Sequence, residues 1–227
     1  MFYDCRQPAS VIGPAATNEK PNQADPSPKG SILKLLALGA NLPFDGRAPA
    51  AALDRALERL EARGIGVAAR SRWWRSPAFP AGAGPDYVNG AAELATDLAP
   101  LALLDALHGV EAELGRRRLG RWEARTCDLD LLAWGDLVLP NPAVQAAWRE
   151  LPPEAQGRRA PETLILPHPR MQDRGFVLAP LAEIAPRWRH PALGRSVAEL
   201  LAALPPAALE GLRPLEGPRR GFPDAAG

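Results

Sequence analysis

The order of the apolar segments restricts this chain to few architectures. Short apolar runs with strand character and longer amphipathic segments with helix character follow one another as strand, helix, strand, strand, helix, strand. We expect the strands at residues 32–38, 67–74, 87–94 and 126–134, and the helices at residues 49–63 and 103–114. This is the split βαβ order of a ferredoxin-like fold. The sequence therefore predicts an α+β single domain: a ferredoxin-like antiparallel sheet with helices packed on one face, and no internal repeat.

The predicted helices carry start and stop signals of their own. Three leucines recur at i, i+4 and i+7 in the first helix: Leu53, Leu57 and Leu60. Pro49 stands near the start of this segment and Gly64 at its stop, as is usual for helix ends. A last element is expected over residues 196–204, because Ser196 and Glu199 have the spacing of a capping box.

The remaining segments predict a flexible segment at each terminus and one insertion, with a core domain over residues 32–204. Residues 1–31 contain five prolines and no periodicity, which predicts a disordered N-terminal extension. Residues 140–161 are polar and flanked by prolines, which indicates an inserted loop with room for a helical turn around Trp148. We expect residues 205–227 to form a mobile C-terminal tail.

Charge and cysteine content exclude several classes of protein. The chain has 27 Lys and Arg against 26 Asp and Glu, so its net charge of +1 gives no general attraction to nucleic acid or to an anionic membrane. Cys5 and Cys127 are the only cysteines, which indicates a reducing compartment. No apolar run is long enough to span a bilayer, and the first 30 residues lack a secretory signal. We expect a cytoplasmic monomer without nucleic-acid or membrane partners.

The most informative short motif is the sequence Asp128-Leu129-Asp130. In a strand the two carboxylates lie on one face about 6.6 Å apart, while Leu129 and Leu131 face the core. Two like charges at this spacing favour a hard cation between them, and Mg²⁺ is commonly held by one or two carboxylates plus substrate phosphates. The alternative is a pair of solvated acids on an exposed strand face.

An arginine-rich segment directly precedes this acidic pair. It contains Arg116, Arg118, Arg121 and Arg125, with Trp122 among them. Guanidinium groups match phosphate oxygens in a bidentate geometry and stay charged at any physiological pH. A solvated surface loop is the alternative, but the neighbouring acidic pair favours a site for magnesium and a nucleotide.

Two further segments offer groups for a planar ligand. Around Ser76-Pro77 and Tyr87, an aromatic face lies near the carboxamide of Asn89, which can donate and accept in one plane. Taken alone, Tyr87 is more often a strand packing residue than a stacking surface, and Asn89 is more often a turn or edge residue. Downstream, His168 is accompanied by Arg174 and Phe176, although a single histidine is more often structural than catalytic.

Several separated motifs occur in an order that resembles a known family. They are Ala37-Leu38-Gly39-Ala40-Asn41-Leu42, Ser76-Pro77, Asp86-Tyr87-Val88-Asn89, Arg121-Trp122 with Arg125-Thr126-Cys127-Asp128-Leu129-Asp130, and Leu166-Pro167-His168-Pro169 with Arg174-Gly175-Phe176-Val177-Leu178. Across residues 33–204 the chain resembles the 6-hydroxymethyl-7,8-dihydropterin pyrophosphokinase family of folate biosynthesis.

The resemblance implies an ATP-dependent diphosphotransferase. It implies that pyrophosphate passes from ATP to the hydroxymethyl group of the dihydropterin with release of AMP, and that two Mg²⁺ ions are carried by ATP and by Asp128 and Asp130. The expected catalytic loop residues are Arg116, Arg118, Arg121, Trp122 and Arg125. The expected pterin-binding residues are Ser76, Pro77, Phe79, Tyr87, Asn89 and Phe176. The expected nucleotide-binding residues are Glu111, Leu131, Ile165, His168 and Arg174.

The chain departs from the family pattern at a few positions. Ala40 replaces a serine, Thr163 stands where some members carry an arginine, and the arginine loop is slightly shorter. Two alternative functions remain at this point. One is another nucleotidyl transferase that uses paired aspartates, and the other is a non-catalytic RNA-binding module, although the chain has no RNP-like aromatic pattern.

Overall fold

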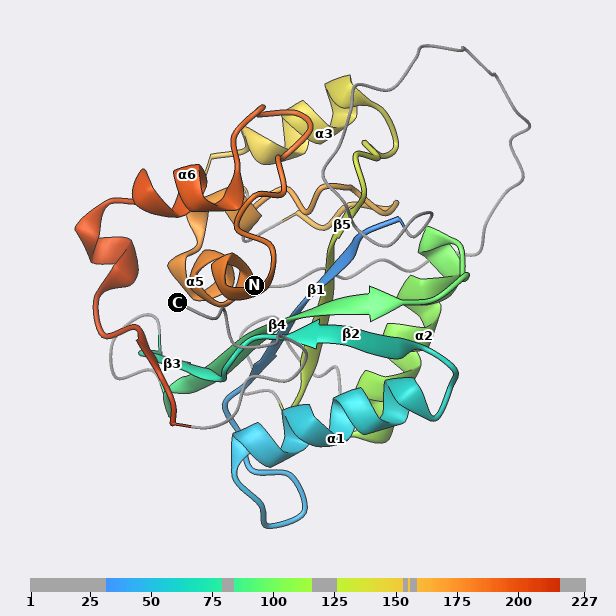
Figure 1. The fold of residues 1–227 in the computed structure, drawn as a ribbon, viewed down its shortest axis with the longest axis vertical. Helices are drawn as coiled ribbons and strands as arrows, with labels where there is room; N and C mark the ends of the chain where they lie inside the picture. Colours follow the sequence, from blue (N-terminus) through green and yellow to red (C-terminus); the bar gives the residue numbers. More distant parts are fainter. Residues whose placement is uncertain (1–31, 79–83, 116–125, 153–154, 156–158, 217–227) are drawn as a thin grey trace, which may run out of the picture.

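The computed structural model describes residues 32–78, 84–115, 126–152, 155 and 159–216 (Figure 1). The predicted disordered extension, residues 1–31, lies outside the described residues. Most of the expected elements are found, with strands β1 Lys34–Ala40, β2 Gly66–Arg70, β3 Trp74–Ser76, β4 Tyr87–Ala95 and β5 Asp128–Trp134. The two predicted helices are α1 Pro49–Glu61 and α2 Pro100–Glu113.

The strands form one antiparallel sheet. Its order is β5-β1-β4-β3-β6, where β6 is the short strand Arg213–Pro214, and β2 also pairs with β4 beyond the start of β3. Strands β5, β1, β4 and β2 thus keep the ferredoxin-like arrangement. In this fold the first and third of the four strands are central, and they correspond here to β1 and β4. The predicted α+β fold with an antiparallel sheet is confirmed.

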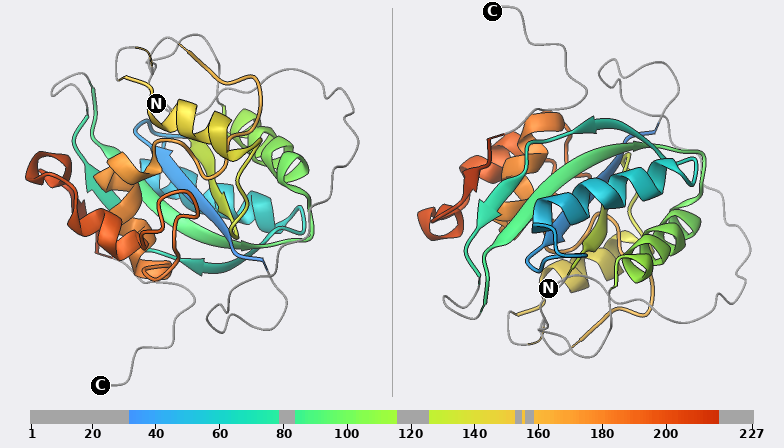
Figure 2. Two further views of the ribbon diagram at one scale, coloured as in Figure 1. Left: turned by 90° about the horizontal axis from the view of Figure 1, so that it is seen from above. Right: turned by 90° about the horizontal axis from the view of Figure 1, so that it is seen from below.

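Helices cover both faces of the sheet, whereas the sequence predicted helices on one face. Helices α1 and α2 pack on one face, and α5 Gly175–Ile184 with α6 Val197–Ala202 packs on the other (Figure 2). Every residue of β1 and of β5 is buried, which is what coverage of both faces requires. The sequence signal for α5 is weak because its residues are apolar nearly all round and it contains Pro180.

The segment predicted as one strand over residues 67–74 is divided into β2 and β3. At the break, the side chain of Ser71 takes the place of a strand carbonyl, because its Oγ accepts the backbone N–H of Ala91 at 2.9 Å. Ala69 and Trp73 belong to different core clusters, so the side chains change faces across the break, and the ring of Trp73 lies against Gly90 of β4. The period-2 pattern in the sequence could not distinguish this break from a continuous strand.

The contact between Trp73 and Gly90 predicts a large effect of a small substitution. A Cβ atom at position 90 would overlap Cζ3 and Cε3 of the Trp73 ring, so we expect Gly90→Ala to lower the free energy of unfolding by about 2–3 kcal/mol. Urea denaturation measures this change. The added substitution Trp73→Phe should recover part of the loss.

The control for that prediction is Gly109→Ala in helix α2. A Cβ at position 109 would meet no atom within 4 Å, and alanine is the better helix former, so this variant should be more stable by up to about 1 kcal/mol. Equal effects of the two glycine substitutions would contradict the proposed overlap with Trp73.

Regular structure occurs in the segments predicted as an inserted loop and as a C-terminal tail, and the helical turn expected around Trp148 is part of a longer helix. Within the expected insertion, residues 140–161, the structure has helix α3 Pro142–Arg149, which begins where Oδ1 of Asn141 accepts the Val144 N–H at 3.0 Å. Within the expected mobile tail, residues 205–216 form the 3₁₀ helix η2 Pro206–Leu209 and strand β6. These residues are ordered because β6 pairs with β3. No local sequence pattern predicts this pairing, because it joins residues that are far apart in the chain. Residues 217–227 lie outside the described residues.

The predicted capping box at the start of α6 is confirmed. Oγ of Ser196 accepts the Glu199 N–H, and the Glu199 carboxylate accepts the Ser196 N–H. In the part of the chain that the structure describes, none of the helices has the length and apolar character needed to cross a membrane.

The buried histidine His190 makes the stability of the fold sensitive to acid. Its side chain is 0% exposed, and its Nδ1 accepts the N–H of Ala192 at 3.2 Å. Burial, assisted by the positive charge of Arg149, lowers the pKa of His190 from 6.5 to about 4. Because the unfolded chain binds a proton more readily, the stability that this neutral imidazole contributes is fully present above pH 6.5 and is lost as the pH falls towards 4.

We therefore expect acidification from pH 7 to pH 5 to lower the free energy of unfolding by about 2 kcal/mol through His190. Urea denaturation of the wild type and of His190→Gln at both pH values measures this contribution as the difference between the two proteins. The variant should lose less stability than the wild type over this pH interval. An identical loss in both proteins would contradict the assignment.

Candidate active site

The acidic pair on β5 is buried rather than solvated. The side chains of Asp128 and Asp130 are 2% and 5% exposed, and Leu129 and Leu131 belong to the core on the opposite face of the sheet. The predicted division of faces along this strand is therefore correct. The alternative of two solvated acids on an exposed strand face is wrong.

Two rows of residues connect this pair to the neighbouring strands. The first row comprises Asn89 on β4, Gly39 on β1 and Asp128 on β5. The next row on the same face comprises Ala91, Ala37 and Asp130. Since adjacent strands lie about 4.8 Å apart, the Cα atoms of Asn89 and Asp128 are separated by about 10 Å. Gly39 lies between them, so no side chain of β1 separates the Asn89 carboxamide from Asp128 in this row.

Arg174 places a positive charge beside the acidic pair. It directly precedes α5, on the face of the sheet that this helix covers. Burial lowers the pKa of Arg174 to about 10, against the opposing influence of the Asp130 and Asp128 carboxylates. The guanidinium therefore stays protonated at neutral pH. Its central carbon also lies 5.6 Å from the centre of the Phe176 ring, within the range of a cation–π contact.

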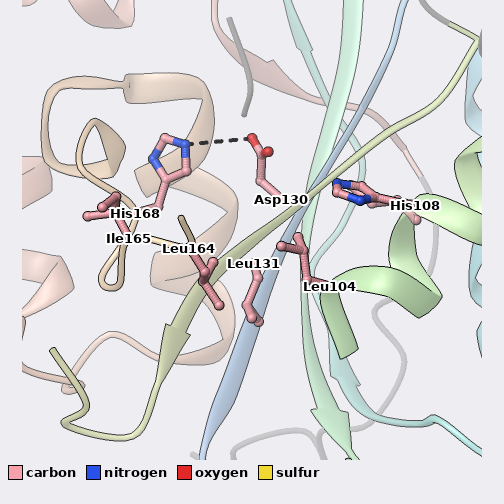
Figure 3. Close-up of a pocket in the computed structure, with 8 residues that line it drawn as sticks. Leu104, His108, Asp130, Leu131, Leu164, Ile165 and His168 are labelled. Atoms are coloured by element: carbon pink, nitrogen blue, oxygen red, sulfur yellow. Dashed lines mark ion pairs between the residues drawn. The ribbon is translucent and has the colours of Figure 1, made fainter. Parts of the chain in front are cut away.

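His168 faces Asp130 as a neutral ring. Its Nε2 lies 4.0 Å from Oδ2 of Asp130 (Figure 3). Burial, together with the positive charges of Arg174 and Arg170, lowers the pKa of His168 well below 6.5. Nδ1 accepts the backbone N–H of Arg170 at 3.2 Å, which assigns the ring proton to Nε2. The imidazole thus presents an N–H donor towards the acidic pair and not a full positive charge.

A pocket next to the acidic pair brings together several of the predicted nucleotide residues. It is lined by Leu104, His108, Leu129, Asp130, Leu131, Leu164, Ile165 and His168 (Figure 3). Leu131, Ile165 and His168 were expected here from the sequence, and the apolar lining suits a heterocyclic base. His108 was missed, although it lies three residues before Glu111 and therefore on the same face of α2.

Glu111 lies close to the acidic pair but contacts the main chain. Its Oε1 accepts the N–H of Leu129 at 2.8 Å in a buried position. Strand β5 is at the edge of the sheet, and the carboxylate satisfies a backbone donor on its outer side. The contact fixes the strand between Asp128 and Asp130. The predicted contact of Glu111 with the nucleotide stays a prediction.

The predicted pterin-binding residues meet at the other end of the row. Nδ2 of Asn89 donates to Oγ of Ser76 at 2.9 Å, and Tyr87 is the register partner of Ser76 on β4. Asn89 is 3% exposed and Tyr87 is half-buried, whereas Pro77 is exposed at the end of β3. Phe176 is half-buried in the first turn of α5. This bond fixes the orientation of the Asn89 carboxamide.

A network that the sequence did not indicate joins β3 to α5. The carboxylate of Glu183 accepts the backbone N–H and the Nε–H of Arg72, both at 2.9 Å, and the Nε1–H of Trp74 at 3.2 Å. Glu183 lies in the last turn of α5, and Ser76 is two residues beyond Trp74. The network therefore holds the strand that carries Ser76 against the helix that carries Phe176.

Six of the expected site residues lie outside the described residues. They are Phe79, Arg116, Arg118, Arg121, Trp122 and Arg125. The described residues contain no cluster of three or more His, Cys, Asp or Glu side chains that could hold a metal ion. The donors that this site offers to a metal are thus the two buried carboxylates, which suits a hard ion that takes its remaining ligands from phosphates and water.

Known proteins share sequence with most of this chain. Residues 35–186 match the family model for 7,8-dihydro-6-hydroxymethylpterin-pyrophosphokinase. The 2-amino-4-hydroxy-6-hydroxymethyldihydropteridine pyrophosphokinase of Pseudomonas aeruginosa is 42% identical over 182 residues, which cover 80% of this chain and 96% of the relative. The Haemophilus influenzae protein of the same name is 36% identical over 155 residues, covering 68% of this chain and 82% of the relative.

Solved structures show the same fold. A crystal structure of wild-type HPPK-DHPS from Plasmodium falciparum superimposes with a TM-score of 0.53 at 13% sequence identity. The match covers 78% of this chain and 45% of that longer chain. Since both the sequence match and the motifs extend over most of the domain, the chain belongs to the 7,8-dihydro-6-hydroxymethylpterin-pyrophosphokinase (HPPK) family, and the prediction of an ATP-using pyrophosphokinase of folate biosynthesis is confirmed.

Proposed function

We propose that this chain transfers pyrophosphate from ATP to the hydroxymethyl group of 6-hydroxymethyl-7,8-dihydropterin and releases AMP. The observation that carries the proposal is the row from Asn89 through Gly39 to Asp128. It provides a carboxamide for the ring and carboxylates for the phosphates about 10 Å apart on one face. A pterin lying along this row has its hydroxymethyl group directed towards the acidic pair.

Two Mg²⁺ ions are proposed to be held by Asp128 and Asp130 together with the phosphates of ATP. Both carboxylates are buried on the same strand face, and carboxylate oxygens are the ligands that Mg²⁺ prefers. When bound, Mg²⁺ would neutralise the charge of the phosphates and stabilise the negative charge that develops on the leaving group. Arg174 adds a fixed positive charge beside the same carboxylates.

Recognition of the pterin is assigned to the end of the row away from the acidic pair. The Asn89 carboxamide donates one N–H to Ser76, which leaves its second N–H and its Oδ1 for the amide edge of the ring. Tyr87 and Phe176 are proposed to stack on the two faces of the ring. Ser76, Pro77 and Phe79 are proposed to complete the pterin-binding site.

The nucleotide is assigned to the pocket between β5 and α2. Leu131 and Ile165 supply apolar contacts for adenine, and His168 and Arg174 supply donors for the triphosphate. The loop residues Arg116, Arg118, Arg121, Trp122 and Arg125 are proposed to hold phosphates and to close over both substrates. A transfer between highly charged groups gains its rate from in-line positioning and preorganised positive charges in a site that excludes water.

Binding of α,β-methylene ATP tests the proposed metal and nucleotide site. With Mg²⁺ present, calorimetric titration should show binding at least about 10-fold tighter than in EDTA, because the acidic pair repels a nucleotide without the metal. Equal affinity in Mg²⁺ and in EDTA would contradict the assignment of Asp128 and Asp130. We also propose that the protein is a cytoplasmic monomer, since one chain carries all the residues assigned to the site and the proposed activity needs no second subunit.

A further inference from the structure

Residues 205–216, which we name the C-terminal strap, run across the pterin side of the molecule. The strap leaves α6, forms η2, and ends in β6 at the edge of the sheet beside β3 (Figure 1). From the sequence, this segment was expected to be part of a mobile tail. Its contacts fall on β3 and α5, which are two of the elements that carry proposed pterin-binding residues.

The first set of contacts is with the start of α5. A Cβ atom at Gly175 would overlap the carbonyl oxygen of Ala208 and would lie 2.9 Å from Cδ2 of Leu209. The backbone of the strap therefore lies directly against the first residue of the helix. Phe176 is the next residue, so the position of the strap bears on the position of this ring.

The second set of contacts is with the end of β3. Gly211 has a φ of +69°, and a Cβ atom there would lie 2.6 Å from Cγ of Pro77. Beyond it, Arg213 pairs with Arg75, and the N–H of Leu215 donates to the carbonyl oxygen of Trp73 at 2.7 Å. The strap thus holds the strand that ends in Ser76 and the proline that follows it.

The strap and the Glu183 network hold β3 and α5 at two separate points. Glu183, in the last turn of α5, is bonded to Arg72 and Trp74 at the start of β3. The strap contacts the first turn of α5, at the other end of the helix, and β3 with its flanking residues, from Trp73 to Pro77. One point of attachment leaves two elements able to pivot, whereas a second point fixes the distance between their far ends.

We propose that the C-terminal strap is a positioning element for the pterin pocket, which sets the separation between the Ser76-Pro77 wall and the Phe176 ring. The inference rests on the proposed function, because it assigns the strap to the pterin half of that site. A stacked planar ligand is sensitive to this separation, since a displacement of about 1 Å removes van der Waals contact on one face of the ring. The pocket assigned to the base is lined by other elements, and Arg174 is the assigned nucleotide residue next to Gly175, so the strap affects nucleotide affinity less than pterin affinity.

Gly211→Ala in the full chain tests the proposal, with Gly64→Ala as the matched control. Both glycines have positive φ, at +69° and +78°, so both substitutions strain the backbone in the same way. A Cβ at Gly64 meets nothing within 4 Å, whereas a Cβ at Gly211 pushes on Pro77. Leu209→Ala is a second variant, which loosens the contact with Gly175 from a half-buried position.

The measurements are the Kd of 6-hydroxymethyl-7,8-dihydropterin in the presence of Mg²⁺ and α,β-methylene ATP, the Kd of that nucleotide alone, and Tm. We expect the pterin Kd to rise about 10-fold in Gly211→Ala and about 3-fold in Leu209→Ala. The nucleotide Kd should change less than about 2-fold in both variants, and Gly64→Ala should bind both ligands as the wild type does. In steady state the pterin KM should rise and the ATP KM should not.

Two results would overturn the inference while leaving the proposed function intact. One is a pterin Kd for Gly211→Ala equal to that of Gly64→Ala, and the other is an equal rise in the pterin and nucleotide Kd values, which indicates general loss of structure. Failure of the wild type to bind the pterin would instead overturn the proposed function, and the inference with it.

Discussion

Replacing Asp130 with asparagine is expected to lower kcat by about 10³-fold, with the protein still folded. The substitution keeps the size of the side chain and removes one of the two buried negative charges proposed to hold Mg²⁺. It also removes a carboxylate that faces both Arg174 and His168, so the positive charge of Arg174 is less well balanced. AMP formation at saturating Mg·ATP and pterin measures the loss.

The matched control for Asp130→Asn is Asp136→Asn. Asp136 is exposed in the turn that follows β5, two residues beyond Trp134, so the same chemical change occurs there outside the site. We expect wild-type kcat for this variant and a comparable Tm for both. Near wild-type turnover by Asp130→Asn would contradict the assignment of the metal to the acidic pair.

Replacing Asn89 with alanine is expected to lower kcat/KM for the pterin by about 10²-fold. The carboxamide is buried and oriented by Ser76, so its loss leaves the amide edge of a bound pterin without partners in a site closed to water. The KM for ATP should stay within about 2-fold of the wild-type value, because the nucleotide pocket is lined by other residues. Initial rates with each substrate varied in turn measure both constants.

Asn141→Ala serves as the control for the loss of a carboxamide. Asn141 caps α3 through a hydrogen bond to Val144, so its replacement costs about 1 kcal/mol of stability without touching the pterin-binding residues. Its kinetic constants should match those of the wild type. Equal losses of kcat/KM for Asn89→Ala and Asn141→Ala would indicate that Asn89 acts through stability and not through the pterin.

The acidic pair could be predicted from the sequence because its signal is local. In a strand, alternation alone places Asp128 and Asp130 on one face and Leu129 on the other, and the structure has this division. The capping box of Ser196 and Glu199 was predictable for the same reason, since all its atoms lie within four residues. The register that brings Asn89 beside Gly39 and Asp128 depends on strand pairing and needed the structure.

The elements that the sequence did not reveal depend on contacts between distant residues. Helix α5 lacks an amphipathic pattern because it is buried nearly all round, so nothing in its sequence distinguishes it from a strand segment. Strand β6 is only two residues long and exists because β3 offers a free edge. The bonds of Glu183 to Arg72 and Trp74 join residues more than 100 positions apart, beyond the reach of any local pattern.

The measurement that tests the central claim most directly is a ³¹P NMR analysis of the products from Mg·ATP and 6-hydroxymethyl-7,8-dihydropterin. The account predicts AMP and the pterin diphosphate in equal amounts, with no turnover when the pterin is omitted. Formation of ADP and a pterin monophosphate, or release of free pyrophosphate, would contradict transfer of pyrophosphate to the hydroxymethyl group.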